Sequence, residues 1–246
     1  MLKSSNPALG DNAFQRLAPG YAGAGEMTIN GTINKTLILL VLLTVPALWM
    51  WDMFTKSGIQ AVSPWMFGGL IGGLVFAVIT VFKKTWAPYT APIYAVLEGL
   101  VIGGISAYAE LQLKGIVFQA VALTFGTLLT MLVAYRSGLI KVTEKFRLGV
   151  VAATGAIFLV YLVSMVLGFF GVSVPLIYSG GTIGILFSLF VVVIAALNLV
   201  LDFDFIEQGA MHGAPKYMEW YGAFGLMVTL IWLYIEFLRL LTKLRQ

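Results

Sequence analysis

Four acidic residues stand inside or at the edge of long apolar stretches of this sequence. Asp202 follows the run 198–201, Asp204 comes two residues later, Glu98 lies in the stretch 91–108, and Glu236 lies deep in the stretch 220–241. A charge at the centre of a bilayer costs about 3 kcal/mol even on the more permissive insertion scales. We therefore expect these four side chains to face the protein interior and to carry chemistry.

The chemistry that these residues favour is proton sharing. Two carboxyl groups brought together where the dielectric constant is low cannot both ionise cheaply, so they hold one proton between them. In the protonated form such a pair links two helices by a hydrogen bond. In the ionised form the two groups repel each other and offer the hard oxygen ligands that suit Ca²⁺. Asp202 and Glu236 are the best candidates on different segments, both for a proton latch and as ligands for a calcium ion. Asp204 and Glu98 come next.

Two further residues are placed to support this pair. Asn198 precedes Asp202 by four residues and so shares its helix face, and Arg239 follows Glu236 by three. Simpler interpretations remain open here. Arg239 can neutralise Glu236 locally, and Asp202 and Asp204 can both lie at the lipid headgroups and end a helix.

Glu98 has a different set of neighbours. Its nearest polar neighbours along a helix are Tyr94 and Thr90, and no basic residue lies in register with it. It therefore requires a partner on another helix or a proton.

The composition identifies the medium in which these acids lie. Hydrophobic residues make up 60% of the 246 residues, charged residues make up 11%, and the mean hydropathy is +0.95. A soluble domain carries about 25% charged residues. So few charges cannot cover a surface that faces water, and we expect most of this chain to lie in lipid.

Several functional classes are excluded or disfavoured. The chain has no cysteine and one histidine, which argues against disulfides, thiolate chemistry and a metal centre built on those residues. It contains no Walker loop, dinucleotide fingerprint or nucleophile elbow. No basic run interleaved with aromatic residues indicates a nucleic-acid partner. We expect no enzymatic activity and no cofactor.

The apolar stretches predict an all-α integral membrane protein, because a helix needs about 20 mostly apolar residues to cross a bilayer. We expect a tail over residues 1–34 and a transmembrane domain of seven helices over residues 35–246. The predicted spans are 36–54, 64–82, 91–108, 115–135, 148–170, 180–201 and 220–241.

Glycines recur within three of these spans. Small residues four positions apart share a helix face and let two backbones approach closely. We therefore predict tight helix packing at 68–73, 99–104 and 180–184.

The basic residues predict the orientation. With the N-terminus in the cytoplasm, the inner segments hold ten Lys and Arg residues, whereas the outer loops hold only Lys56 and Lys114, apart from the C-terminal cluster Arg239, Lys243 and Arg245. This bias favours a cytoplasmic N-terminus. The basic C-terminus is the dissenting signal, since a re-entrant seventh segment would return it to the cytoplasm. We favour seven full spans.

The order and spacing of several short motifs resemble a known family. Residues 196–202 (Ala-Leu-Asn-Leu-Val-Leu-Asp) resemble the sixth span of the Bax inhibitor or YccA-like proteins, and residues 232–241 stand in the place of the final Leu-Tyr-Leu-Asp stretch of that family. Residues 5–9, Met27-Thr28 with Gly31 and Lys35, and Glu98-Gly99-Leu100 look like its bacterial branch. The resemblance covers residue 5 to the C-terminus.

The resemblance implies a seven-helix bundle with a central C-terminal helix and a pH-sensitive calcium leak across the inner membrane. In this family an aspartate pair on the last two helices shares a proton. Asp202 matches the first position, with Asp204 as the alternative, and Glu236 matches the second. The family latch also uses an arginine on the second helix, and this sequence has none there. Lys83 and Lys84 are the nearest basic residues.

A second function is also implied by the resemblance. Some family members are described as regulators that bind other membrane proteins, such as a quality-control protease, without ion flux. The polar N-terminal tail would then be the binding segment. The expected partners are the lipid bilayer, calcium ions and protons, and in this second case a membrane protease.

Overall fold

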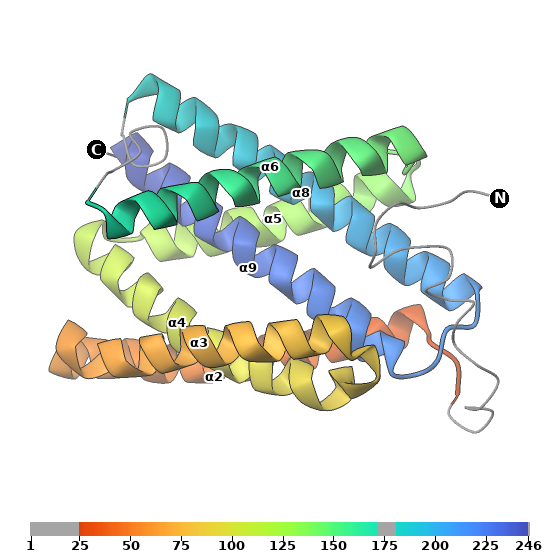
Figure 1. The fold of residues 1–246 in the computed structure, drawn as a ribbon, viewed down its shortest axis with the longest axis horizontal. Coiled ribbons are helices and arrows are strands. Elements are labelled where there is room, and N and C mark those ends of the chain that lie inside the picture. Colours follow the sequence, from red (N-terminus) through yellow and green to blue (C-terminus); the bar gives the residue numbers. More distant parts are fainter. Residues whose placement is uncertain (1–24, 172–180, 246) are drawn as a thin grey trace. The chain divides into compact units, whose positions relative to one another are not determined.

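A computed structural model describes residues 25–171 and 181–245 (Figure 1). The motif at 5–9, most of the predicted tail and Gly180 lie outside these ranges. The described elements are long α-helices and one short 3₁₀ helix. They are α2 (Ile29–Ser57), α3 (Ile59–Phe82), η2 (Lys84–Trp86), α4 (Ala87–Gln112), α5 (Ile116–Arg136), α6 (Glu144–Phe169), α8 (Thr182–Met211) and α9 (Met218–Arg245).

The expected seven spans are confirmed. Within the described ranges, seven helices are long and apolar enough to cross a membrane, with η2 and α4 counted as one span. Several helices extend one or two turns beyond the predicted limits. Thr28 caps α2 by accepting a hydrogen bond from the Gly31 N–H at 2.9 Å, so this helix begins at Ile29 and not at residue 36.

The extension of α8 changes the setting of the candidate acids. The predicted span ended at Leu201, whereas the helix continues to Met211 because no glycine or proline interrupts it before Gly209. Asp202 therefore lies nine residues before the end of the helix. Asp202 therefore does not end the helix, as the simpler interpretation required, whereas its depth relative to the headgroups stays a prediction.

Helix α9 is continuous over 28 residues, or about 42 Å at 1.5 Å per residue. This length exceeds the ~30 Å hydrocarbon core of a bilayer. A re-entrant seventh segment therefore does not fit. In the most apolar windows of α4 and α9, 61% of residues are buried, against 17% in α2, α3, α5 and α6. Helices α4 and α9 are thus the most buried of the seven, whereas α2, α3, α5 and α6 are mostly exposed.

The chain divides into two compact units. Unit 1 comprises residues 1–111 and 204–227, and unit 2 comprises residues 112–203 and 228–246. Unit 1 therefore holds α2, α3, α4, the end of α8 and the start of α9. Unit 2 holds α5, α6, most of α8 and the remainder of α9. Asp202 and Glu236 both belong to unit 2, whereas Asp204 and Glu98 belong to unit 1.

In unit 1 the glycines of α3 and α4 allow the close packing that the sequence predicted. A Cβ atom on Gly69 would lie 2.7 Å from the Leu97 carbonyl oxygen of α4, and one on Gly103 would lie 2.4 Å from the Ala47 carbonyl oxygen of α2. Any side chain at these two positions would force the helices apart. The small residues thus set the distance between α4 and its two neighbours.

In unit 2, α6 and α8 run antiparallel and side by side. The Asn198 side chain donates a hydrogen bond to the Thr154 hydroxyl at 2.8 Å, and the rings of Tyr161 and Phe187 meet edge to face with centroids 6.2 Å apart. Ile157, Val191 and Ile194 form a buried cluster between these two contacts. The pairing of later residues on α6 with earlier residues on α8 establishes the antiparallel direction.

Candidate functional site

Asp202 has one hydrogen-bond partner on α9. The Thr229 hydroxyl donates to its carboxylate. The other oxygen, Oδ2, is buried and has no hydrogen-bond partner among the described residues. A buried acceptor without a partner costs free energy unless a proton or a cation satisfies it. Among the described acidic side chains, Asp202 is therefore the one with a buried oxygen that lacks a partner.

Glu236 is fully compensated by comparison. Its side chain is 1% exposed, and the Tyr161 hydroxyl donates to Oε1 at 2.8 Å. Arg239 Nη1 donates to Oε1 at 2.9 Å and to Oε2 at 3.2 Å. The same guanidinium group donates to the Tyr161 hydroxyl and lies over the Tyr161 ring, 4.8 Å from its centroid. The local ion pair between Glu236 and Arg239 is present, and Tyr161 of α6 completes it.

Lys243 extends the polar face of α9. It is 5% exposed, and its ammonium group donates to the Gly184 carbonyl oxygen at 2.9 Å and to the Ser188 hydroxyl at 2.8 Å, both on α8. Thr229, Glu236 and Lys243 follow one another at intervals of seven residues. Seven residues make almost two full turns, so these side chains share one face of the helix. We call this row of three the α9 polar stripe.

Helix α8 presents a matching row to the α9 polar stripe. Asp202 contacts Thr229 and Ser188 contacts Lys243, which are 14 residues apart on each helix. This antiparallel register places Ala195, which is fully buried, opposite Glu236.

The register also separates the two predicted latch residues. Asp202 lies at the level of Thr229, seven residues from Glu236, which is a rise of about 10 Å along α9. The structure gives each of these carboxylates its own partners. A proton shared directly between them would require α8 and α9 to shift along each other. The shared proton stays a prediction, and so does a calcium ion bound by both residues.

Asn198 contacts α6 rather than Asp202. Besides the bond to Thr154, its amide nitrogen donates to the Ile194 carbonyl oxygen at 2.8 Å. It therefore fixes the α6–α8 interface one turn from Asp202. Among the predicted supporting residues, Arg239 contacts a latch candidate directly and Asn198 acts through the helix packing.

The two acids of lower rank lie in unit 1. Asp204 is 8% exposed. Glu98 forms a hydrogen bond with Tyr94, one turn earlier on α4. Its Oε1 atom lies 3.2 Å from the point where a Cβ on Gly73 of α3 would be. Glu98 thus has Tyr94 as a partner within its own helix and faces Gly73 of α3.

A fifth acid, Glu219, is absent from the candidates that the sequence indicated. This residue is fully buried in unit 1. It accepts hydrogen bonds from the N–H and the hydroxyl of Thr28, each at 2.9 Å, and forms ion pairs with Lys35 and with Lys216, the latter at 2.9 Å. We call Glu219 and these three partners the Glu219 clasp.

The Glu219 clasp holds the segment before α2 against the α8–α9 connection. The Met27 N–H donates to the Ala214 carbonyl oxygen at 2.7 Å, and Glu26 forms an isolated β-bridge with Pro215. Gly31 leaves room for Glu219, because a Cβ there would lie 2.0 Å from its Oε1. No local spacing in the sequence indicates this contact, since Thr28 and Glu219 are 191 residues apart.

The other missed residues differ in how well the sequence indicates them. Thr229 and Lys243 lie at heptad spacing on either side of Glu236, so a search along that helix face would have found them. Tyr161 and Ser188 carry no such signal, because only the packing of α6 and α8 brings them to α9. No cluster of three acidic or histidine side chains that could bind a metal occurs within residues 25–171 and 181–245.

The comparisons with known proteins agree with the resemblance of the motifs. A model of the family described as "Bax inhibitor 1 like" matches residues 6–246. No curated protein and no solved structure matches the chain. A match over nearly the whole length, together with seven membrane-spanning helices, shows that the chain is a multi-pass membrane protein that belongs to the Bax inhibitor 1-like family.

Proposed function

We propose that this protein is a pH-sensitive leak pathway for calcium and other cations, controlled by protonation of Asp202 and Glu236. The observation that supports this proposal most strongly is the buried Oδ2 atom of Asp202, which has no hydrogen-bond partner in the described part of the chain. A proton or a cation would satisfy this atom. Because the two compete for one oxygen, the occupancy of the site by a cation would depend on pH.

The two carboxylates have different parts in this proposal. Glu236 is neutralised by Arg239 and held by Tyr161, so its charge is compensated in place. Among the described residues Asp202 has the Thr229 hydroxyl as its partner and one oxygen without any, so we expect it to be the more sensitive of the two to the proton concentration. The ionised form of Asp202 offers an oxygen ligand to a passing cation, whereas the protonated form offers a hydrogen-bond donor and no charge.

Calcium flux into liposomes that contain the purified full-length protein tests the proposal. We expect the wild-type flux to depend on pH, and we expect Asp202→Asn to give a low flux that no longer varies over the range in which the wild type responds. In Glu236→Gln we expect the flux to vary less steeply with pH than it does in the wild type. Asp52→Asn is the matched control, because Asp52 is an exposed acid of α2. Equal flux in the wild type and in both variants would reject the proposal.

A second candidate function is a regulator that binds other membrane proteins, such as a quality-control protease. The Glu219 clasp favours this alternative to the extent that it fastens residues 26–28 to the α8–α9 connection. A partner bound to the preceding residues would then act on the start of α9. Deletion of residues 1–24 leaves the clasp intact. It should abolish capture of the partner and leave ion flux unchanged, whereas a loss of flux would favour the first function.

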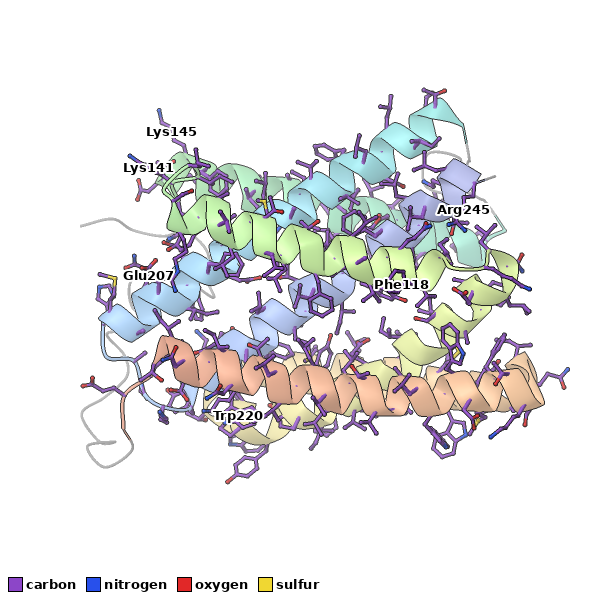
Figure 2. All side chains as sticks on the ribbon, turned by 180° about the vertical axis from the view of Figure 1, so that it is seen from behind. Phe118, Lys141, Lys145, Glu207, Trp220 and Arg245 are labelled. Atoms are coloured by element: carbon purple, nitrogen blue, oxygen red, sulfur yellow. The ribbon has the colours of Figure 1, made fainter. Side chains whose placement is uncertain are left out.

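We also propose that the N-terminus lies in the cytoplasm and that the protein lies in the inner membrane. Figure 2 shows Lys141 and Lys145 at the α5–α6 connection, and Arg245 contacts Gln119 at the opposite end of α5. The α5–α6 end carries Arg136 and Arg147 as well, which supports a cytoplasmic position for it. Because the chain lacks cysteine, a single cysteine introduced at Lys141 and labelled with an impermeant maleimide tests the orientation. We expect no labelling from outside intact cells. Labelling there would place the α5–α6 connection outside the cell and contradict the proposed orientation.

A further inference from the structure

The charges along the α9 polar stripe change sign from one end to the other. Asp202 of α8 lies beside Thr229, Glu236 and Arg239 form an ion pair near the middle, and Lys243 lies at the far end. Lys243 is about 20 Å from the level of Thr229, since 14 residues separate them at 1.5 Å each. A cation that follows this face therefore meets acidic oxygens first and a buried ammonium group last.

The acidic residues of unit 2 do not neutralise Lys243, because the attraction that Glu236 exerts on its ammonium group is outweighed by the repulsion from Arg239. The sequence of this unit contains three acidic residues, namely Glu144, Asp202 and Glu236. Glu144 begins α6 at the opposite end of that helix, Asp202 is four turns away, and Glu236 is paired with Arg239. The two acceptors that Lys243 does contact, the Gly184 carbonyl and the Ser188 hydroxyl, carry no net charge.

Two other positive charges, Arg239 and Arg245, lie near this end of α9 but not on the polar stripe. Arg245 donates to the Lys114 carbonyl oxygen and to the Gln119 side chain, and Figure 2 shows it where α5 begins. Arg239 lies one turn before Lys243. Lys243 differs from Arg245 in two respects, because it is buried between α8 and α9 and because it lies on the polar stripe. Arg245 is two residues further on, so it points about 200° away around the helix.

We propose that Lys243 is an electrostatic barrier at the end of the α9 polar stripe that limits the passage of cations, and of divalent cations most of all. This inference rests on the proposed cation leak. A fixed positive charge with little water around it repels a cation far more strongly than a solvated one does. The α8 acceptors hold the ammonium group in place without cancelling its charge.

The barrier has a signature that a purely structural role would lack. The repulsion is proportional to the charge of the passing ion, so removal of Lys243 lowers the barrier for Ca²⁺ by twice as much as for K⁺. The factor by which the Ca²⁺ flux rises is then the square of the factor by which the K⁺ flux rises. If Lys243→Met raises the K⁺ flux about threefold, it raises the Ca²⁺ flux about ninefold. Looser packing would raise both fluxes by similar factors.

The experiment measures K⁺ and Ca²⁺ flux through the full-length protein in liposomes, for the wild type and for matched variants. Lys243→Met keeps the length of the side chain and removes the charge. Arg245→Gln removes one charge from the same helix end but away from the stripe, and Lys243→Arg keeps the charge. Ser188→Ala removes a hydrogen bond of Lys243 and leaves the ammonium group in place.

We expect a squared relation between the two fluxes in Lys243→Met and fluxes near the wild-type values in the three other variants. Two results would show that Lys243 only fastens α8 to α9 and would overturn the inference. One is an increase of the K⁺ and Ca²⁺ fluxes by the same factor in Lys243→Met. The other is an increase in Ser188→Ala as large as that in Lys243→Met. Unchanged flux in Lys243→Met would overturn it while the proposed function stands. The absence of flux from every protein would reject both. If Lys243→Met does not fold, as judged by gel filtration, Lys243→Gln takes its place.

Discussion

Unit 1 and unit 2 each contain a deeply buried carboxylate that is paired. Among the described residues, the carboxylate with a buried oxygen that lacks a hydrogen-bond partner lies in unit 2. Glu219 of unit 1 has two lysines and both donors of Thr28 around it. Asp202 of unit 2 has a single threonine hydroxyl and one oxygen without a partner among the described residues. Both lie in a protein that is built for an apolar medium.

The difference shows two uses of a buried acid. A carboxylate surrounded by donors is held in its ionised form, and it fastens distant parts of the chain together. A carboxylate with too few donors costs stability, and it retains the capacity to exchange a proton or a cation. We therefore expect mutations in the Glu219 clasp to lower the stability of the protein. Mutations of Asp202 should instead alter the ion flux. Four predictions test this contrast.

The largest effect on stability should come from Gly31→Ala. The new Cβ would lie 2.0 Å from the Glu219 Oε1, so the carboxylate has to move away from its donors. Breaking a buried ion pair in this way costs about 3 kcal/mol of unfolding free energy. Thermal unfolding in detergent measures the loss. Gly68→Ala is the control, because nothing lies within 4 Å of a Cβ there. Equal stability of the two variants would contradict the account of the clasp.

The next effect compares the two acids directly. Glu219→Gln removes the charge that Lys35 and Lys216 neutralise, and we expect a loss of about 2 kcal/mol, reduced because Lys216 is partly exposed. Asp202→Asn should change the stability by less than about 1 kcal/mol, since none of the described basic residues forms an ion pair with it. Thermal unfolding of both variants measures the difference. A larger loss in Asp202→Asn than in Glu219→Gln would reverse the contrast.

A smaller effect is expected from Tyr161→Phe. This change removes the hydroxyl that donates to Glu236 and receives from Arg239, and it leaves the ion pair between them. The expected loss is about 1 kcal/mol, as for one buried hydrogen bond. Tyr89→Phe serves as the control, because Tyr89 is 76% exposed. Tyr161 would not be part of the Glu236 site if the two changes were equivalent in unfolding experiments.

The smallest effect should follow Lys56→Gln. Lys56 and Asp52 form an ion pair at 2.7 Å on α2, with both side chains more than half exposed. Exposed pairs of this kind contribute little to stability, because solvent and salt screen them. We expect the same unfolding temperature as in the wild type at low and at high salt. A measurable loss would show that exposure is not what separates this pair from the clasp.

Much of the architecture follows from the sequence alone. Seven apolar stretches predict seven helices because a helix satisfies its own backbone hydrogen bonds in lipid, and this requirement is local. The ion pair between Glu236 and Arg239 is also local, since residues three positions apart share a helix face. For the same reason, heptad spacing along α9 places Thr229 and Lys243 in line with Glu236, whichever helix packs against that face.

Only the tertiary structure decided which of these residues meet. Asp202 contacts Thr229, and Glu236 lies two turns further along, because the register of α8 against α9 is set by the packing of both helices and not by either sequence. Tyr161 reaches Glu236 from α6, and Thr28 reaches Glu219 across 191 residues. Helix propensity and hydropathy act over a few turns, whereas these contacts depend on how whole helices pack. The sequence thus determined where the charges lie along each helix, and packing determined which of them are neutralised.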